Sequence, residues 1–312
     1  MLQHESNTAA KMKMTGAAWL MLLGLSCFWG SSFFWTEIAL QGLPVLAIVA
    51  LRLALAAVVL WLVVWLSGAR VPREPRIWGA YLVMGLLNSV IPFSLIVWGQ
   101  TDITSSLASI LIATTPVFTV VIAALFLNDE PATGAKIAGV IIGFLGVVVM
   151  IGPDAFNNHG KSVLAQLAIV LAGVSYATAT VFGRRFHSLG LSPNVSAACQ
   201  VSVSTIFILP FAYFTGGFDN ASAAPPIVWV AILSLAVLST AVAYILFFRI
   251  LATAGATNAM LVTFLTPVTA ILLGTLILHE TLNFYEILGM LLIALALIAI
   301  DGRLFSRRPT GG

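Results

Sequence analysis

A single arginine interrupts an apolar run near the start of the sequence. Arg52 follows VLAIVAL and precedes LALAAVVLWLVVWL. If this run crosses a membrane, an unpaired cation there costs roughly 3 kcal/mol, so Arg52 needs a partner. The partner is either the carboxylate of a bound ligand or a structural group, such as backbone carbonyls or Glu37. The position of Arg52 in the outer third of its run lets the side chain reach toward the membrane surface, which favours the structural role.

Polar and aromatic residues recur at helical spacing in other apolar runs. Asn88, Pro92 and Trp98 fall on one helical face, and Tyr244 and Phe248 fall on another. Polar side chains at membrane depth face protein or a water-filled cavity. For Trp98 and Tyr244, the aromatic belt at the membrane surface is an equal alternative. We expect a central cavity for a small molecule, lined by Trp29, Ser32, Phe33, Asn88, Pro92, Trp98, Tyr244, Phe248, Asn258 and Thr263.

Residue types that catalyse reactions or bind metals are sparse. The 4 histidines lie in tails, in loops or at the ends of apolar runs, and their spacing matches no metal site. The apolar runs hold no Ser/His or Asp/Asp pair that could act as a catalytic set. We therefore expect no catalytic residues, no metal and no cofactor. Cys27 and Cys199 both lie inside apolar runs, so a disulfide framework is not expected either.

The composition places these residues in a membrane. Hydrophobic residues make up 60% of the 312 residues and charged residues only 8%, and the mean hydropathy is +1.07. Soluble domains carry about 25% charged residues, so the chain is predicted to be an all-α integral membrane protein. Runs of about 20 apolar residues predict ten transmembrane helices, at 15–38, 44–67, 77–99, 103–127, 134–152, 163–185, 193–215, 226–249, 255–278 and 283–302.

Lysine and arginine are distributed unevenly over the connections between these helices. Of the 14 Lys and Arg residues, only Lys161 falls on the side opposite the N-terminus, and Arg52 lies within a helix. Short basic connections stay in the cytoplasm. Both termini are therefore expected to be cytoplasmic, in a cell (inner or plasma) membrane. The basic charge then reflects topology, and no nucleic-acid partner is expected.

Two segments of the chain have nearly the same sequence. TTPVFTVVIAALFLNDE ends at Glu130 and LTPVTAILLGTLILHE ends at Glu280, and aligning Pro116 with Pro267 also superposes their flanks. Proline in mid-helix loosens the helix, so Pro116 and Pro267 are candidate hinges; a kink that only improves packing is the alternative. Each glutamate precedes a helix N-terminus, so we expect it to cap the helix that follows; a gate or proton carrier is the alternative.

This repeat divides the chain into two five-helix units around a central cavity. We expect a tail at 1–14, one repeat at 15–152, a second at 163–303 and a tail at 304–312. Because five is odd, the second unit is inverted, a plan typical of secondary transporters that work by alternating access. Duplication of a stable helical unit without transport is the alternative. The GVIIG segment is expected to pack within the chain, which predicts a monomer or weak dimer.

The paired motifs resemble the drug/metabolite transporter superfamily, EamA type. The resemblance rests on the duplicated Pro-Val and Leu-x-Glu motifs, on FWGSSFF and on Arg52, and it covers about residues 16–303. The resemblance implies ten helices, cytoplasmic termini and a central cavity. Many members of the family export amino acids or other metabolites. The aromatic amino-acid exporters of the YddG type are the branch that we expect. The second half lacks a counterpart of Arg52, and Tyr176 stands where the first half has Trp29. The cavity, with Tyr176 in its lining, is therefore expected to be chemically asymmetric.

The sequence thus predicts a non-enzymatic secondary transporter that exports small metabolites. Aromatic or bulky apolar amino acids are the first substrate class, and lipophilic drugs are the alternative for the same fold. A channel is disfavoured because no ring of charges or carbonyl filter motif is present, and a membrane enzyme is disfavoured for want of a catalytic set. The expected partners are the small-molecule substrate and membrane lipid.

Overall fold

The computed structural model describes residues 15–127, 133–156, 160–188, 191–219 and 221–301. The two predicted tails and Glu130 lie outside these residues. Within them every regular element is helical and no strand occurs, which confirms the all-α class. The elements are, in chain order, α1 (Gly16–Leu40), α2 (Val45–Ser67), α3 (Pro75–Gly85), η1 (Leu86–Val90), α4 (Ile91–Gly99), α5 (Ser105–Ile112), α6 (Thr115–Phe126), α7 (Gly134–Phe156), α8 (Gly160–Ser188), α9 (Pro193–Phe214), η2 (Ala221–Ala223), α10 (Pro226–Leu233), η3 (Ser234–Val242), α11 (Ala243–Ala254), α12 (Ala256–Ala259), α13 (Val262–Leu276) and α14 (Phe284–Asp301).

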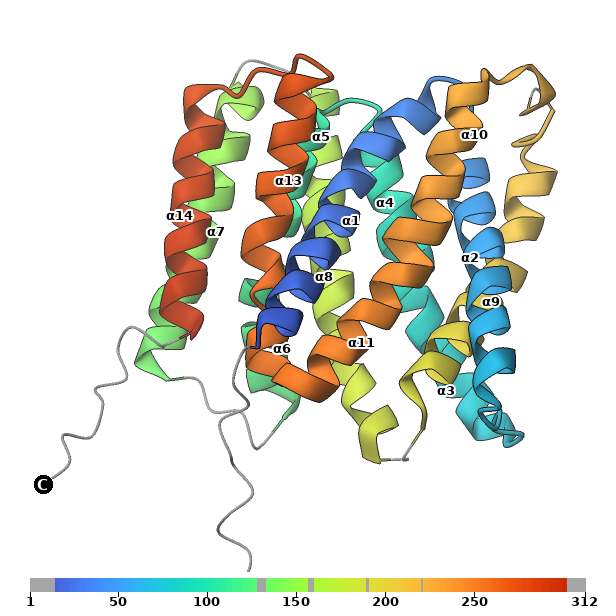
Figure 1. Cartoon of the computed structure of the whole chain (residues 1–312). Coiled ribbons are helices and arrows are strands. Elements are labelled where there is room, and N and C mark those ends of the chain that lie inside the picture. Colours follow the sequence, from blue (N-terminus) through green and yellow to red (C-terminus); the bar gives the residue numbers. More distant parts are fainter. Residues whose placement is uncertain (1–14, 128–132, 157–159, 189–190, 220, 302–312) are drawn as a thin grey trace, which may run out of the picture.

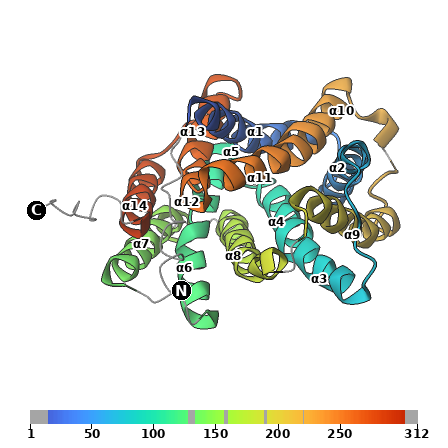
Figure 2. The ribbon, with the colours of Figure 1, turned by 60° about the horizontal axis from the view of Figure 1, so that its bottom comes forward.

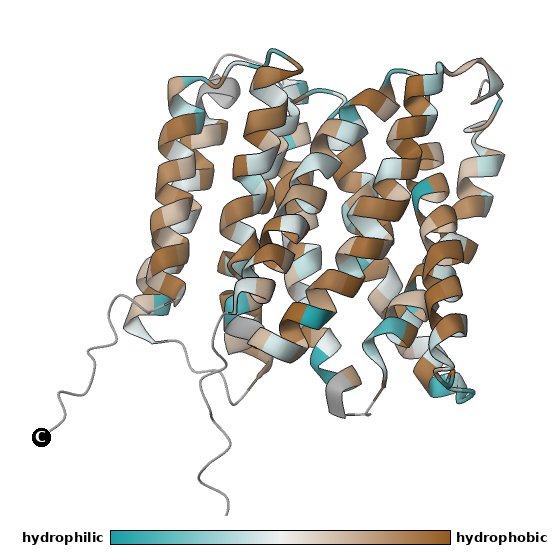
Figure 3. Ribbon diagram, viewed as in Figure 1, coloured by the Kyte–Doolittle hydropathy of each residue, from teal (hydrophilic) through white to brown (hydrophobic). Residues whose placement is uncertain are grey.

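Eight helical segments of the described chain are long and apolar enough to cross a membrane. Two of them, Pro75–Gly99 and Pro226–Ala254, join several elements into one continuous span. Two further apolar helices are shorter, Val262–Leu276 and Phe284–Ile300. Hydrophobic residues cover most of the helix surfaces, and strongly hydrophilic residues gather toward the two ends of the bundle (Figure 3). This is the distribution of a multi-pass membrane protein.

The helices stand side by side in one bundle (Figures 1 and 2). α7 and α14 pack together at one edge, and α2 packs on α9 near the other. Between them α1 packs on α13 and α4 packs on α8. The connections α1–α2, α4–α5 and α13–α14 lie at what we call the upper end, whereas α1 begins and α14 ends at the lower end (Figure 1).

Glycines let α7 and α14 approach closely. A Cβ added at Gly139 would lie 2.8 Å from the carbonyl oxygen of Ala296, and one at Gly146 would lie 3.0 Å from that of Gly289. A side chain at Gly139 would therefore force the helices to shift, and one at Gly146 would press on its neighbours in α14. The glycine face that includes GVIIG therefore packs within the chain, as predicted.

Two spans contain a π-helical segment. These are η1 within Pro75–Gly99 and η3 within Pro226–Ala254. The offset that superposes Pro116 on Pro267 also places η1 inside η3. π-Helical turns are rare and are frequent at functional sites, so their matched positions point to a shared role.

The two repeated prolines occupy different local settings. Pro116 lies in the first turn of α6, directly after the break that separates α5 from α6. Pro267 lies inside α13, which follows the break after α12. Both therefore follow a break in their segment, and their role as hinges remains a prediction.

Candidate functional site

Arg52 is buried between elements of both sequence halves. It lies about two turns inside the start of α2 and is 6% exposed. Its Nε donates a hydrogen bond to Thr240 Oγ1 at 2.9 Å, and its guanidinium carbon lies 3.8 Å from the centre of the Phe93 ring. A hydroxyl and a ring face stabilise a cation without neutralising it. Within the described residues no carboxylate pairs with Arg52, so Glu37, one of its expected partners, does not fill that role.

The π-helical segment η3 presents the partner of Arg52. Thr240 Oγ1 donates to the carbonyl oxygen of Leu235, five residues earlier, at 2.8 Å. Because this bond uses the hydroxyl proton, the oxygen is free to accept from Arg52. The sequence prediction missed Thr240, although it precedes Tyr244 by four residues and so shares the helical face of Tyr244 and Phe248.

Asn88 and Tyr244 link the two π-containing spans. Asn88 Nδ2, in η1, donates to Tyr244 Oη, in α11, at 3.1 Å. The hydroxyls of Tyr244 and Tyr176 both lie close enough to Arg52 to interact with it electrostatically. Three of the predicted cavity residues and the predicted anchor therefore meet at one place, from α2, η1, α8 and α11.

Aromatic rings continue from this place toward α1. The ring centres of Tyr244 and Phe248 are 6.4 Å apart, those of Phe248 and Phe247 are 5.6 Å apart, and those of Phe247 and Trp29 are 5.5 Å apart. Such spacings are those of contacting aromatic side chains. The structure thus brings Trp29, Tyr244 and Phe248 into one row and adds Phe247, which the sequence prediction missed because it lies off their common face.

Three predicted polar residues bond to backbone carbonyls three or four residues before them in the chain. Ser32 Oγ donates to a carbonyl three residues back at 2.6 Å, and Thr263 Oγ1 does the same at 2.7 Å. Asn258 Nδ2 donates to a carbonyl four residues back at 2.8 Å. These bonds satisfy local backbone groups, so the geometry gives these residues a local structural role.

The remaining predicted residues lie on α1 and on the span Pro75–Gly99. Phe33 and Pro92 are both buried. Trp98 is 42% exposed, near the upper end of α4. That position suits the aromatic belt at a membrane surface.

A second polar region lies at the upper end. A pocket of about 710 Å³ is lined there by α1, the α4–α5 connection, α5, α8, the α13–α14 connection and α14. Four carboxylates line this pocket, those of Glu37, Asp102, Glu280 and Glu286. Its lining includes no lysine or arginine, so we call this region the acidic pocket.

Glu280 caps α5, which belongs to the other half of the sequence. Its Oε1 accepts the Ser105 N–H at 2.9 Å, and its Oε2 accepts the Ser106 N–H at 3.0 Å and the Ser106 hydroxyl at 2.5 Å. Thr104 Oγ1 accepts the next N–H, that of Leu107, at 3.2 Å. The first three N–H groups of α5 are thus satisfied, and a negative charge faces the positive end of the helix.

The expectation that Glu280 caps the helix that follows it is wrong. α14 has its own reciprocal cap, in which the Asn283 N–H donates to Glu286 Oε2 at 2.8 Å and the Glu286 N–H donates to Asn283 Oδ1 at 2.9 Å. The start of α14 is therefore satisfied locally, and Glu280 is left to reach α5. The same expectation for Glu130 lies outside the described residues.

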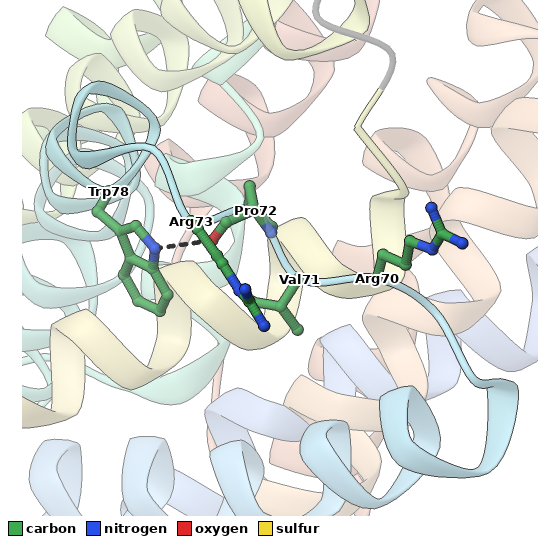
Figure 4. Close-up of a pocket in the computed structure, with 5 residues that line it drawn as sticks. All are labelled: Arg70, Val71, Pro72, Arg73 and Trp78. Carbon is green, nitrogen blue, oxygen red and sulfur yellow. Dashed lines mark hydrogen bonds between the residues drawn. The ribbon is translucent and has the colours of Figure 1, made fainter.

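A second pocket, of about 720 Å³, lies at the lower end along the α2–α3 connection (Figure 4). Its lining residues are Arg70, Val71, Pro72, Arg73 and Trp78. Trp78 Nε1 donates to the carbonyl oxygen of Pro72 at 3.0 Å, and the two arginines are exposed. None of these residues belongs to the predicted cavity.

The helical spans, the buried cation and the polar ends define a multi-pass membrane protein. The chain matches the EamA-like transporter family twice, over residues 16–152 and over residues 163–300. It belongs to this family of the drug/metabolite transporter superfamily, and is a membrane transporter.

Individual relatives are similar over nearly the whole chain. The uncharacterized transporter YoaV of Bacillus subtilis is 25% identical over 290 residues, which are 93% of this chain and 98% of YoaV. The uncharacterized inner membrane transporter YedA of Escherichia coli K12 is 24% identical over 291 residues, 92% of each chain. A solved crystal structure shares the fold with a TM-score of 0.67 at 19% identity, over 94% of this chain and 99% of that one.

Proposed function

We propose that the protein is a secondary transporter that exports small zwitterionic metabolites, with aromatic or bulky apolar amino acids as the first substrate class. The observation that best supports this proposal is the environment of Arg52. Its buried guanidinium has a hydroxyl and a ring as neighbours, and no carboxylate among the described residues. A buried cation of this kind attracts a substrate carboxylate, because charge-assisted hydrogen bonds to a guanidinium are strong and directional.

The surroundings of Arg52 support an amphipathic substrate. The row of rings from Tyr244 to Trp29 offers apolar surface beside the guanidinium. Asn88 and Tyr244 add hydrogen-bonding groups at the same place. Sites for small molecules combine such apolar walls with a few placed polar groups. A phosphate-bearing substrate is disfavoured, because a single arginine is a poor match for several phosphate charges.

Alternating access is supported by the position of Arg52 at the junction of the two sequence halves. Arg52 lies in the first half and Thr240 in the second, and each half has a π-helical segment at the matched position. We propose ten spans in two inverted repeats, with α13 and α14 as the last two. The α2–α3 connection, α3 and α11 lie toward the lower end. They carry the exposed residues Arg73, Arg76 and Arg249, so we assign that end to the cytoplasm.

Counterflow in proteoliposomes tests the proposed function. Vesicles loaded with unlabelled amino acids are expected to accumulate trace labelled phenylalanine in a saturable way. Tyr244→Ala should abolish this uptake, whereas Tyr213→Ala, which changes a 70% exposed surface tyrosine, should leave it intact. Folded protein that exchanges no amino acid would contradict the proposed substrate class. Exchange of lipophilic amines without amino acids would instead establish the alternative, a multidrug exporter of the same fold.

A further inference from the structure

One oxygen of the Glu37 carboxylate lacks a hydrogen-bond donor. It lies about one turn inside the upper end of α1 and lines the acidic pocket. Its Oε2 is buried and has no hydrogen-bond partner among the described residues. The carboxylate of Glu280 lies close enough to repel it. A charged oxygen in this setting is destabilised, because no donor among the described residues pairs with Oε2 and a second carboxylate lies nearby.

Gln100 adds a second buried acceptor to the same place. Its side chain hydrogen-bonds to Glu37, lines the same pocket and is only 3% exposed. Its Nε2 donates to the carbonyl oxygen of Phe33 at 2.9 Å, which fixes the orientation of the amide. Its Oε1 is buried and, like Glu37 Oε2, has no partner within the described chain. Two unsatisfied acceptors, one on α1 and one on the residue that follows α4, therefore line one acidic pocket.

The charged groups around α1 do not supply the missing donor. Asp102 and Glu286 line the pocket and are themselves acids. His279 is exposed on the α13–α14 connection and is not part of the pocket lining. Arg52, on α2, lies deeper in the bundle and bonds to Thr240. Arg249 belongs to α11, a helix toward the lower end.

We propose that Glu37 is a proton-binding site that couples the transporter to the pH at its upper end. A proton from the solution adds to Glu37 Oε2 and removes the negative charge. The resulting hydroxyl is a donor at a place where Glu37 Oε2 and Gln100 Oε1 otherwise have none. The described residues include no group of three or more His, Cys, Asp or Glu side chains that could hold a metal ion. The arrangement therefore fits a proton better than a metal ion.

Through Glu280, the protonation state of Glu37 affects a contact between helices at the upper end. The α13–α14 connection is held to α5 by the three hydrogen bonds of Glu280. A charged Glu37 repels the carboxylate that makes them, and a neutral Glu37 does not. Protonation of Glu37 therefore stabilises this contact at the upper end. If the protein exports its substrate as proposed above, a proton taken up after substrate release would favour closure of the upper end.

Infrared spectroscopy of the full-length protein in detergent tests proton binding without a substrate. The wild type is expected to show the C=O band of a protonated carboxylic acid at neutral pH, with a shift in D₂O. Glu37→Gln should lose this band, and Asp102→Asn, which removes an exposed carboxylate from the same pocket, should keep it. Glu37→Asp keeps a titratable group, and its band should move in frequency, which covers the case in which Glu37→Gln does not fold.

Three results would overturn the proposal. These are a wild type without the band, a band that persists in Glu37→Gln, or one that is unchanged in Glu37→Asp. A carboxylate band that shifts with Na⁺ and not with choline would show that the site binds sodium instead of a proton, and would also overturn the proposal. Because these spectra require no transport, they test proton binding independently of the proposed function, which is tested by counterflow.

A transport measurement tests the coupling itself. In proteoliposomes, exchange should depend on the pH outside in the wild type and in Asp102→Asn, and this dependence should be lost in Glu37→Gln.

Discussion

Removing the Glu280 side chain is expected to destabilise the upper end of the bundle. Glu280→Ala deletes the three hydrogen bonds to Ser105 and Ser106, and with them the charge at the start of α5. Hydrogen bonds to a charged group contribute about 1.5–3 kcal/mol each, and a lost helix cap costs about 1 kcal/mol. Water in the acidic pocket can replace part of this, so we expect a net loss of about 2–4 kcal/mol in the free energy of unfolding.

Thermal unfolding in detergent, followed by tryptophan fluorescence at one heating rate, measures this effect. The midpoint should fall by about 4–8 °C, from roughly 2 °C per kcal/mol for a chain of this size. Glu280→Gln keeps the shape and loses the charge, so its shift should be about half as large. Asp102→Ala is the matched control, because Asp102 is exposed in the same pocket and accepts only from the Thr101 hydroxyl at 3.0 Å. A shift for Glu280→Ala no larger than that of Asp102→Ala would refute the cap.

Three further predictions use the same measurement. Thr240→Val removes the acceptor of the Arg52 Nε–H and should lower the free energy of unfolding by about 1.5–3 kcal/mol. Thr205→Val is the control and should lower it less, because the Thr205 hydroxyl bonds only to its own helix; equal shifts in the midpoint would contradict the Arg52 contact. Gly274→Ala places a Cβ against Glu280 Oε2 and Ser106 Oγ and should lower the midpoint of unfolding. Gly79→Ala is the control: its Cβ would meet nothing within 4 Å, so it should raise the midpoint slightly, and the opposite order would contradict the packing at Gly274. Gly139→Leu places a Cβ against Ile300 and the Ala296 carbonyl oxygen, so it should separate α7 from α14 and cost about 2 kcal/mol or more. Gly134→Ala, with nothing within 4 Å, is the neutral control, and an unchanged midpoint for Gly139→Leu would contradict the close contact.

The sequence was sufficient to predict the all-α membrane class and the place of most helices. Long apolar runs are a strong signal, because a helix in lipid must satisfy its backbone internally. Arg52 could be singled out for the same reason, since a cation inside an apolar run is expensive. The GVIIG face could be assigned to close packing because small residues permit it.

The partners of these residues could not be read from the sequence. Glu280 and Ser105 are 175 residues apart, and nothing local indicates that α5 lacks a full cap of its own. The reciprocal cap of Asn283 and Glu286 was visible in the sequence and would have freed Glu280 from α14. The π-helical segments depend on tertiary packing of the spans, so the contact between Arg52 and Thr240 required the structure.

The most direct test of the central claim is whether Arg52 recognises a substrate carboxylate. Phenylalanine and phenethylamine differ only by that carboxylate, so each is used to compete with labelled phenylalanine in counterflow. The wild type and Arg73→Gln, which changes an exposed lower-end arginine, should prefer phenylalanine by about tenfold or more, equivalent to about 1.4 kcal/mol. Arg52→Gln should lose this preference while remaining folded. A preference that survives in Arg52→Gln would contradict the assignment of Arg52 as the anchor.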